Sequence, residues 1–153
     1  MIYCDLDGVL TDFDGGFFDI AGKLPSEISR KELWDVVSIT SGYWLNLKKM
    51  ADADMLISYL SQGTYQILTG LPIRGYKTAE IEKRAWVKQH LGNDIKVICC
   101  LSKDKSLYCQ KGDILIDDRK KNICQWEQAG GIGILHTSSQ ETIQILEALK
   151  LNA

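Results

Sequence analysis

The chain has 153 residues, of which 45% are hydrophobic and 25% are charged, and its formal net charge is −2. This length suits one domain with a sizeable core, and the apolar fraction excludes a disordered chain. The balanced charge argues against a surface for polymeric nucleic acid, and no apolar run is long enough to cross a membrane.

Short apolar runs alternate with helical patterns along the chain, which indicates a parallel sheet covered by helices. The expected fold class is α/β, with a doubly wound, Rossmann-like sheet in a single domain over residues 1–153. The predicted strands are MIYCD (1–5), YQILT (65–69), KVICCL (96–101), DILIDD (113–118) and GIGILH (131–136).

Residues 15–46 interrupt this alternation and hold several aromatic side chains among polar residues. Ser29 and Glu32 have the spacing of a capping box, so a helix is expected after them. We therefore predict a small, mainly helical cap inserted after the first strand. Such a cap would stand above the carboxyl ends of the strands, where ligands bind in open α/β sheets.

Amphipathic helices are expected between the later strands. One spans 48–63 and the next runs from about 78 to 91, ending before a glycine. A third covers roughly 121–129. The last begins at Ser138, which forms a second capping box with Glu141.

The five cysteines contain no CxxC pair, and the chain has two histidines, so a zinc site is not expected. The first residues, MIYC, already read as a strand, with no basic leader and apolar segment. We therefore expect a cytoplasmic protein.

Carboxylates follow two of the predicted strands. Asp5 and Asp7 end the first strand, and Asp117 and Asp118 end the fourth. If these strands are neighbours, the four carboxylates converge, and oxygen ligands of this kind suit Mg²⁺. The cluster could hold a structural cation, or one carboxylate could act as a nucleophile on phosphorus and form an aspartyl-phosphate.

Groups suited to phosphate binding follow two other strands. Thr69 and Gly70 close the second strand, where a hydroxyl and backbone N–H groups can surround phosphate oxygens. Lys105 follows the third strand and can supply the positive charge that phosphoryl transfer requires.

The segment DLDGVLTD (5–12) resembles the first motif of the haloacid-dehalogenase-like (HAD) phosphohydrolases, DxDGxxxD. Thr69, Lys105 and IDD (116–118) resemble their second, third and fourth motifs. A closer resemblance is to the 5′(3′)-deoxyribonucleotidases of that superfamily. It rests on DLDGVLTDFDGGF (5–17), IEKRAWVKQHLG (81–92), LSKDKS (101–106), DILIDDR (113–119) and, more loosely, YWLNLKKMADA (43–53).

The resemblance implies roles for the acidic residues. Asp5 would attack phosphorus and bind Mg²⁺. Asp7 would act as general acid and base and offer its backbone carbonyl to the metal. Its pKa would have to be lifted by acidic neighbours. Asp118 would be the second side-chain ligand, and Asp117 would hold Lys105 or a metal-bound water, although the two aspartates could exchange these roles.

The resemblance also implies that Thr69, Gly70 and Lys105 bind the phosphate. Gly70 stands where these nucleotidases commonly have serine, so one hydroxyl contact is lost or replaced by backbone. Lys83 either extends the positive field or lies on a solvated helix face. Lys103 stands where the family often has arginine, which leaves its contact open.

Substrate specificity is expected from Phe13, Trp34 and Trp44, which either line a base pocket or fill a small core between cap and sheet. We expect a Mg²⁺-dependent phosphomonoesterase that acts on a (deoxy)nucleoside monophosphate through an aspartyl-phosphate. The alternatives are the same chemistry on a sugar phosphate or a 3′-phosphate end, or a non-catalytic nucleotide-binding module. The partner would be a small molecule, and the resemblance also allows a homodimer.

Overall fold

The computed structural model describes residues 1–152 and contains a five-stranded sheet in the order β3-β2-β1-β4-β5. All neighbouring strands are parallel, and Ile2 lies opposite both Tyr65 and Ile114. This confirms the predicted α/β class with a doubly wound sheet. The strands are β1 (Ile2–Cys4), β2 (Tyr65–Gly70), β3 (Val97–Cys100), β4 (Ile114–Asp117) and β5 (Ile132–Leu135).

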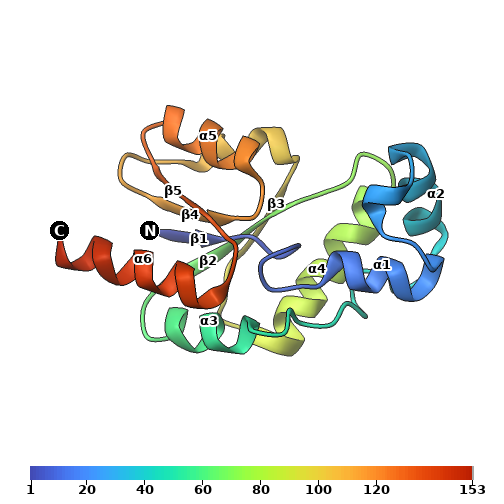
Figure 1. The fold of residues 1–153 in the computed structure, drawn as a ribbon, viewed down its shortest axis with the longest axis horizontal. Helices are drawn as coiled ribbons and strands as arrows, with labels where there is room; N and C mark the ends of the chain where they lie inside the picture. Colours follow the sequence, from blue (N-terminus) through green and yellow to red (C-terminus); the bar gives the residue numbers. More distant parts are fainter. Residues whose placement is uncertain (153) are drawn as a thin grey trace.

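Helices cover both faces of this sheet. Figure 1 shows α3 and α6 on one side and α5 on the other, with α1 and α2 standing apart at one end. The helices are α1 (Phe13–Ala21), α2 (Arg30–Ile39), α3 (Ala53–Leu60), α4 (Tyr76–Leu91), α5 (Lys120–Gln128) and α6 (Ser139–Leu151), and the short 3₁₀ helices are η1 (Pro25–Glu27) and η2 (Ser102–Tyr108). No helix in the described part of the chain combines the length and apolarity that crossing a bilayer demands.

Alternating residues of the central strands pack into two cores. Cys4, Ile67 and Ile116 contribute to the core that includes Leu56 of α3, Trp86 of α4 and Leu146 of α6. Their neighbours Tyr3, Leu68 and Leu115 pack on the opposite face with Ile123 and Trp126 of α5. Both faces of the sheet are thus buried, which explains why the strand sequences are apolar without strict alternation.

The helix predicted over 48–63 begins only at Ala53. The backbone before it pairs with the loop after β1: Asp12 N donates to Lys48 O at 2.9 Å, and Met50 N donates to Leu10 O at 2.9 Å. These bonds hold residues 48–50 in a non-helical conformation. A tertiary contact therefore overrides the local helical pattern.

The two predicted N-caps are present. Ser29 Oγ accepts from Glu32 N at 3.1 Å, and Ser138 Oγ accepts from Glu141 N at 3.2 Å. The Glu141 carboxylate accepts from the Thr137 hydroxyl instead of the backbone N–H of Ser138, so only the serine half of this capping box is formed among the described residues.

Residues from α1 up to the start of α3 share an apolar cluster of their own, which includes Phe17, Val37, Tyr43 and Trp44. This cluster rests on α4. Trp86 Nε1 donates to Leu47 O at 2.8 Å, and the Glu82 carboxylate accepts from the backbone N–H of Trp44 at 3.0 Å. The cap segment is thereby held beside the carboxyl ends of the strands.

Replacing Leu56 by alanine is expected to lower the free energy of unfolding by about 2–5 kcal/mol, because the change leaves a cavity in the larger core. Leu56 is 0% exposed, whereas its neighbour Met55 is 53% exposed. The matched variant Met55→Ala should change stability by no more than about 0.5 kcal/mol. Urea unfolding of both variants measures the difference, and equal losses would contradict this account of the core.

Candidate active site

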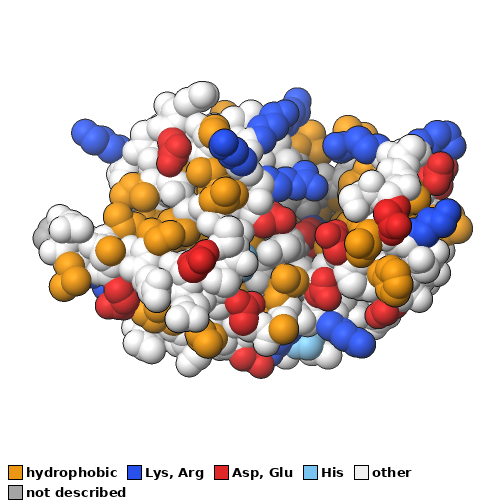
Figure 2. Space-filling view, in the orientation of Figure 1, with side chains coloured by type: hydrophobic (Ala, Val, Ile, Leu, Met, Phe, Trp, Pro, Cys, Tyr) orange, Lys and Arg blue, Asp and Glu red, His pale blue; other side chains and the backbone are white. Residues whose placement is uncertain are grey.

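A cavity of about 960 Å³ opens at the carboxyl ends of the strands, beside α1 and α2. Figure 2 shows a hollow there, with acidic side chains beside it and lysines and arginines around its rim. The residues predicted from the sequence that line the cavity are Asp5, Asp7, Phe13, Trp34, Trp44, Gly70, Lys103 and Asp118.

Asp5 follows β1 and is held on several sides. Its backbone N donates to Ile116 O at 2.9 Å, which ties it to β4. Its carboxylate accepts from Leu6 N at 2.8 Å and pairs with Lys105 Nζ at 3.0 Å. One carboxylate is thus fixed between two strands, with an ammonium behind it.

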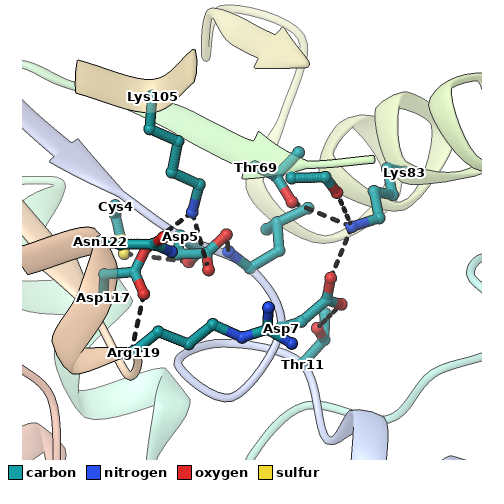
Figure 3. Close-up of polar contacts among 12 residues, drawn as sticks. Cys4, Asp5, Asp7, Thr11, Thr69, Lys83, Lys105, Asp117, Arg119 and Asn122 are labelled. Atoms are coloured by element: carbon teal, nitrogen blue, oxygen red, sulfur yellow. Dashed lines mark hydrogen bonds and ion pairs between the residues drawn. The ribbon is translucent and has the colours of Figure 1, made fainter. Parts of the chain in front are cut away.

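Lys105, on η2, bridges two carboxylates. Its Nζ lies 3.0 Å from Asp5 and 2.6 Å from Asp117, and its side chain is 2% exposed. Burial alone would lower the pKa of Lys105, but the charges of Asp5 and Asp117 outweigh it and raise the pKa above its usual value. Figure 3 shows this ammonium reaching between the two carboxylates.

The neighbouring aspartates of β4 differ in their contacts. Asp117 accepts from Lys105 and from Asn122 Nδ2, at 2.6 and 2.9 Å, on one oxygen, and from Arg119 N at 2.8 Å on the other. No described residue donates a hydrogen bond to the Asp118 carboxylate. Withdrawal from water and the charges of Asp5 and Asp117 raise the pKa of Asp118 to about 7.

These carboxylates fit a divalent cation. Asp5, Asp117 and Asp118 each offer an oxygen, and the three oxygens lie within 4.8 Å of one another. A hard cation such as Mg²⁺ binds oxygen donors of this kind and would favour the ionised form of Asp118, whose carboxylate accepts no hydrogen bond from the described residues. Asp5 and Asp118 are the ligands best placed to hold it, because the oxygens of Asp117 already accept three hydrogen bonds.

Gly8 makes room for Asp118. Its φ is +81°, and a Cβ built on it would lie 2.1 Å from Asp118 Oδ2. A side chain at this position would therefore meet both a strained backbone and the carboxylate itself. The positive φ favours glycine at this position of the DxDG segment, and the absence of a side chain leaves room for the Asp118 carboxylate.

Asp7 faces a lysine of α4. Lys83 Nζ donates to Asp7 Oδ2 at 2.5 Å, and the Thr11 hydroxyl donates to Asp7 Oδ1 at 3.0 Å. Asp5 and Asp7 therefore each have an ammonium partner of their own. The direct contacts of Asp7 are thus an ammonium and a hydroxyl, whereas we expected acidic neighbours around it.

Lys83 is 2% exposed, so the solvated helix face considered from the sequence is wrong. Its Nζ also donates to Thr69 Oγ1 at 3.1 Å and Gly70 O at 2.7 Å, and it lies 4.3 Å from the centre of the Trp44 ring. The buried residues of α4 include Ala79, Trp86 and Val87 as well as Lys83. Helical spacing from those apolar residues could have placed Lys83 on the buried face.

The predicted phosphate-binding residues differ in whether they reach the cavity wall. Gly70 lines the cavity, while Thr69 and Lys105 are not among its lining residues. Thr69 is 0% exposed, and its hydroxyl accepts from Lys83. The sequence patterns assign no role to Ser102, Arg119 or Asn122, although all three line the cavity and Asn122 also donates to Asp117.

The three aromatic residues predicted to set substrate specificity lie between the cavity and an apolar cluster. Phe13, Trp34 and Trp44 line the cavity and also contact one another, with ring centres 5.5–6.5 Å apart. Trp44 is buried, whereas Phe13 and Trp34 are half-buried. The same cluster therefore builds the cap core and offers aromatic surface to a ligand.

A parallel sheet of this order, with carboxylates and lysines gathered at the strand ends, defines a doubly wound α/β protein whose ligand site lies at the carboxyl edge of the sheet. A hydrolase of Streptococcus pneumoniae TIGR4, known from its crystal structure, shares this fold with a TM-score of 0.57 and 14% identity, over 95% of this chain and 97% of that one. Residues 1–148 match the family described as "5′ nucleotidase, deoxy (Pyrimidine), cytosolic type C protein", and the chain belongs to that family.

Two mammalian proteins illustrate the relationship. The mitochondrial 5′(3′)-deoxyribonucleotidase of Mus musculus is 27% identical over 146 residues, which cover 77% of this chain and 64% of the mouse protein. The cytosolic-type 5′(3′)-deoxyribonucleotidase of Homo sapiens is 27% identical over 142 residues, covering 77% of this chain and 70% of the human protein. The chain thus spans less than two thirds of the length of the mouse relative.

Proposed function

We propose that this protein is a Mg²⁺-dependent phosphomonoesterase that releases phosphate from (deoxy)nucleoside monophosphates through an aspartyl-phosphate. The observation that carries the proposal is the position of Asp5. Asp5 pairs with Lys105, belongs to the cluster of three carboxylates and lines the cavity that also has aromatic side chains in its wall. The activity named for the relatives supports the substrate class.

In the first half of the proposed reaction, a carboxylate oxygen of Asp5 bonds to phosphorus, and the bond from phosphorus to the sugar oxygen breaks. Asp7 gives its proton to that leaving oxygen. The proton would sit on Oδ1, because Lys83 holds Oδ2 and the partner of Oδ1 is the rotatable Thr11 hydroxyl. In the second half, Asp7 takes a proton from water, which attacks phosphorus and frees Asp5.

Asp5 and Asp118 would hold the metal, and the backbone carbonyl of Asp7 is the third protein ligand proposed. Bound Mg²⁺ would neutralise charge on the phosphoryl oxygens. Lys105 keeps Asp5 in place and compensates the charge of Asp117. Gly70 lets the phosphate approach the end of β2, and Lys103 adds positive charge at the rim.

A panel of monophosphates tests the proposal. Phosphate release is expected from deoxyribo- and ribonucleoside monophosphates with Mg²⁺, and EDTA should abolish it until Mg²⁺ is restored. Faster turnover of sugar phosphates or of a 3′-phosphate end would replace the nucleotide proposal with one of the alternative substrates. Nucleotide binding without any phosphate release would identify a binding module instead.

Replacing Trp34 by alanine is expected to lower kcat/KM for nucleoside monophosphates about tenfold, because stacking on one base is worth about 1–3 kcal/mol. Deoxyribose 5-phosphate, which has no base, should be hydrolysed at the same rate by both proteins. Initial rates with the two substrates check this, and an equal loss on both would show that Trp34 only supports the cap.

We also propose the cytoplasm as the compartment. All five cysteines are free thiols, which is typical of a reducing environment.

A further inference from the structure

Gly70, at the end of β2, lies against the hydroxyl of Ser102. A Cβ built on Gly70 would lie 2.5 Å from Ser102 Oγ and 3.6 Å from Ser102 Cβ. The φ of Gly70 is not positive, so the backbone conformation does not demand glycine there. The Ser102 hydroxyl thus occupies space that a side chain at position 70 would need.

The Ser102 hydroxyl is also available for a ligand. Ser102 begins η2, two residues after the end of β3, and lines the same cavity as Asp5 and Gly70. No hydrogen bond joins its hydroxyl to another residue among 1–152. Thr69, which precedes Gly70 in β2, also carries a hydroxyl. That hydroxyl is buried and accepts a hydrogen bond from Lys83, so it does not face the cavity.

We infer that the Ser102 hydroxyl binds a phosphate oxygen of the substrate in the space that Gly70 leaves open. This inference rests on the proposed phosphatase function, because it concerns the phosphate of the same substrate. The hydroxyl comes from the loop after β3, while Thr69, one residue before Gly70, serves to hold Lys83. A hydroxyl donor to a charged oxygen forms one of the stronger hydrogen bonds in proteins.

Removing that donor should weaken phosphate binding. Ser102→Ala is expected to raise the KM for a nucleoside monophosphate and the inhibition constant of inorganic phosphate about tenfold, the effect of one hydrogen bond to a charged group. Ser106→Ala, in the same 3₁₀ helix but outside the cavity, should leave both constants unchanged. Ser102→Thr keeps the hydroxyl and should keep most of the affinity.

The position of Gly70 gives an independent test. Gly70→Ala is expected to push the Ser102 hydroxyl aside and to raise the same constants, and adding it to Ser102→Ala should cause little further loss. Gly70→Ser in the Ser102→Ala background places a hydroxyl close to the original position and should lower the inhibition constant again. Unfolding midpoints are measured for every variant, so that constants are compared between folded proteins.

Two results would overturn the inference. One is an unchanged inhibition constant in Ser102→Ala, and the other is a full, multiplicative loss when Gly70→Ala is added to it. Calorimetric titration with inorganic phosphate and Mg²⁺ measures this binding without turnover. A wild-type protein that binds phosphate through Ser102 but releases none from any monophosphate would sink the proposed function and leave this inference standing.

Discussion

Asp5→Asn is expected to lower kcat by about 10⁴-fold or more, the scale of loss when a covalent nucleophile is removed. The amide keeps the shape of the side chain but cannot attack phosphorus. It also removes one of the two charges that pair with Lys105, and the pair with Asp117 at 2.6 Å remains to hold that ammonium. Phosphate release in single-turnover and steady-state assays measures the loss.

The control for this variant is Asp19→Asn, because Asp19 is an exposed residue of α1 that does not line the cavity around Asp5. It makes the same chemical change and should retain wild-type turnover. Incubation of wild type with a ³²P-labelled substrate, followed by acid quench, should trap label on the protein, and Asp5→Asn should trap none. Turnover within tenfold of wild type in Asp5→Asn would rule out Asp5 as the nucleophile.

Lys83→Met is expected to lower kcat by about 10²–10⁴-fold, the contribution of a well-placed general acid and base. The ammonium holds Asp7 Oδ2 at 2.5 Å and orders Thr69 and the end of β2. Without it, the Asp7 carboxylate loses its fixed direction, while the contacts of Asp5 with Lys105 and with Leu6 N are retained. The effect should therefore fall on kcat far more than on KM.

Lys88→Met is the matched control, because Lys88 is exposed on the same helix. A second comparison separates positioning from mere support of the fold. If Lys83 acts through Asp7, the double variant Lys83→Met, Asp7→Asn should be no slower than Asp7→Asn alone. Multiplicative losses in the double variant would show that Lys83 acts in another way.

Local sequence patterns locate the strands of the sheet. Each predicted strand lies within one or two residues of its expected bounds, because its apolar run is buried on both faces. The helix expected from residue 48 fails at its start, because residues 48–50 bond to the loop after β1. The spacing of apolar residues gives no information about a hydrogen bond to backbone about forty residues earlier in the chain, such as the bond from Met50 N to Leu10 O.

Some residues of the candidate site can be identified from the sequence, and others only from the folded chain. The aspartates after β1 and β4 were found because they directly follow strands, and the parallel sheet brings β1 and β4 side by side. The partner of Asp7 was left open, because Lys83 is 76 residues away and reaches it only through the packing of α4. Ser102 was passed over because only the folded chain sets its hydroxyl against Gly70.

The sequence by itself determined the class of fold, the acidic residues at the strand ends and the aromatic character of the cap. Each of these features depends on residues close together in the sequence, because the helix and strand periods decide which of them share a face of a helix or lie at an end of a strand. Only the tertiary structure decided which lysine pairs with which aspartate and which hydroxyl faces the cavity. Those contacts depend on how helices cross the sheet, and a few ångströms there decide whether two side chains meet.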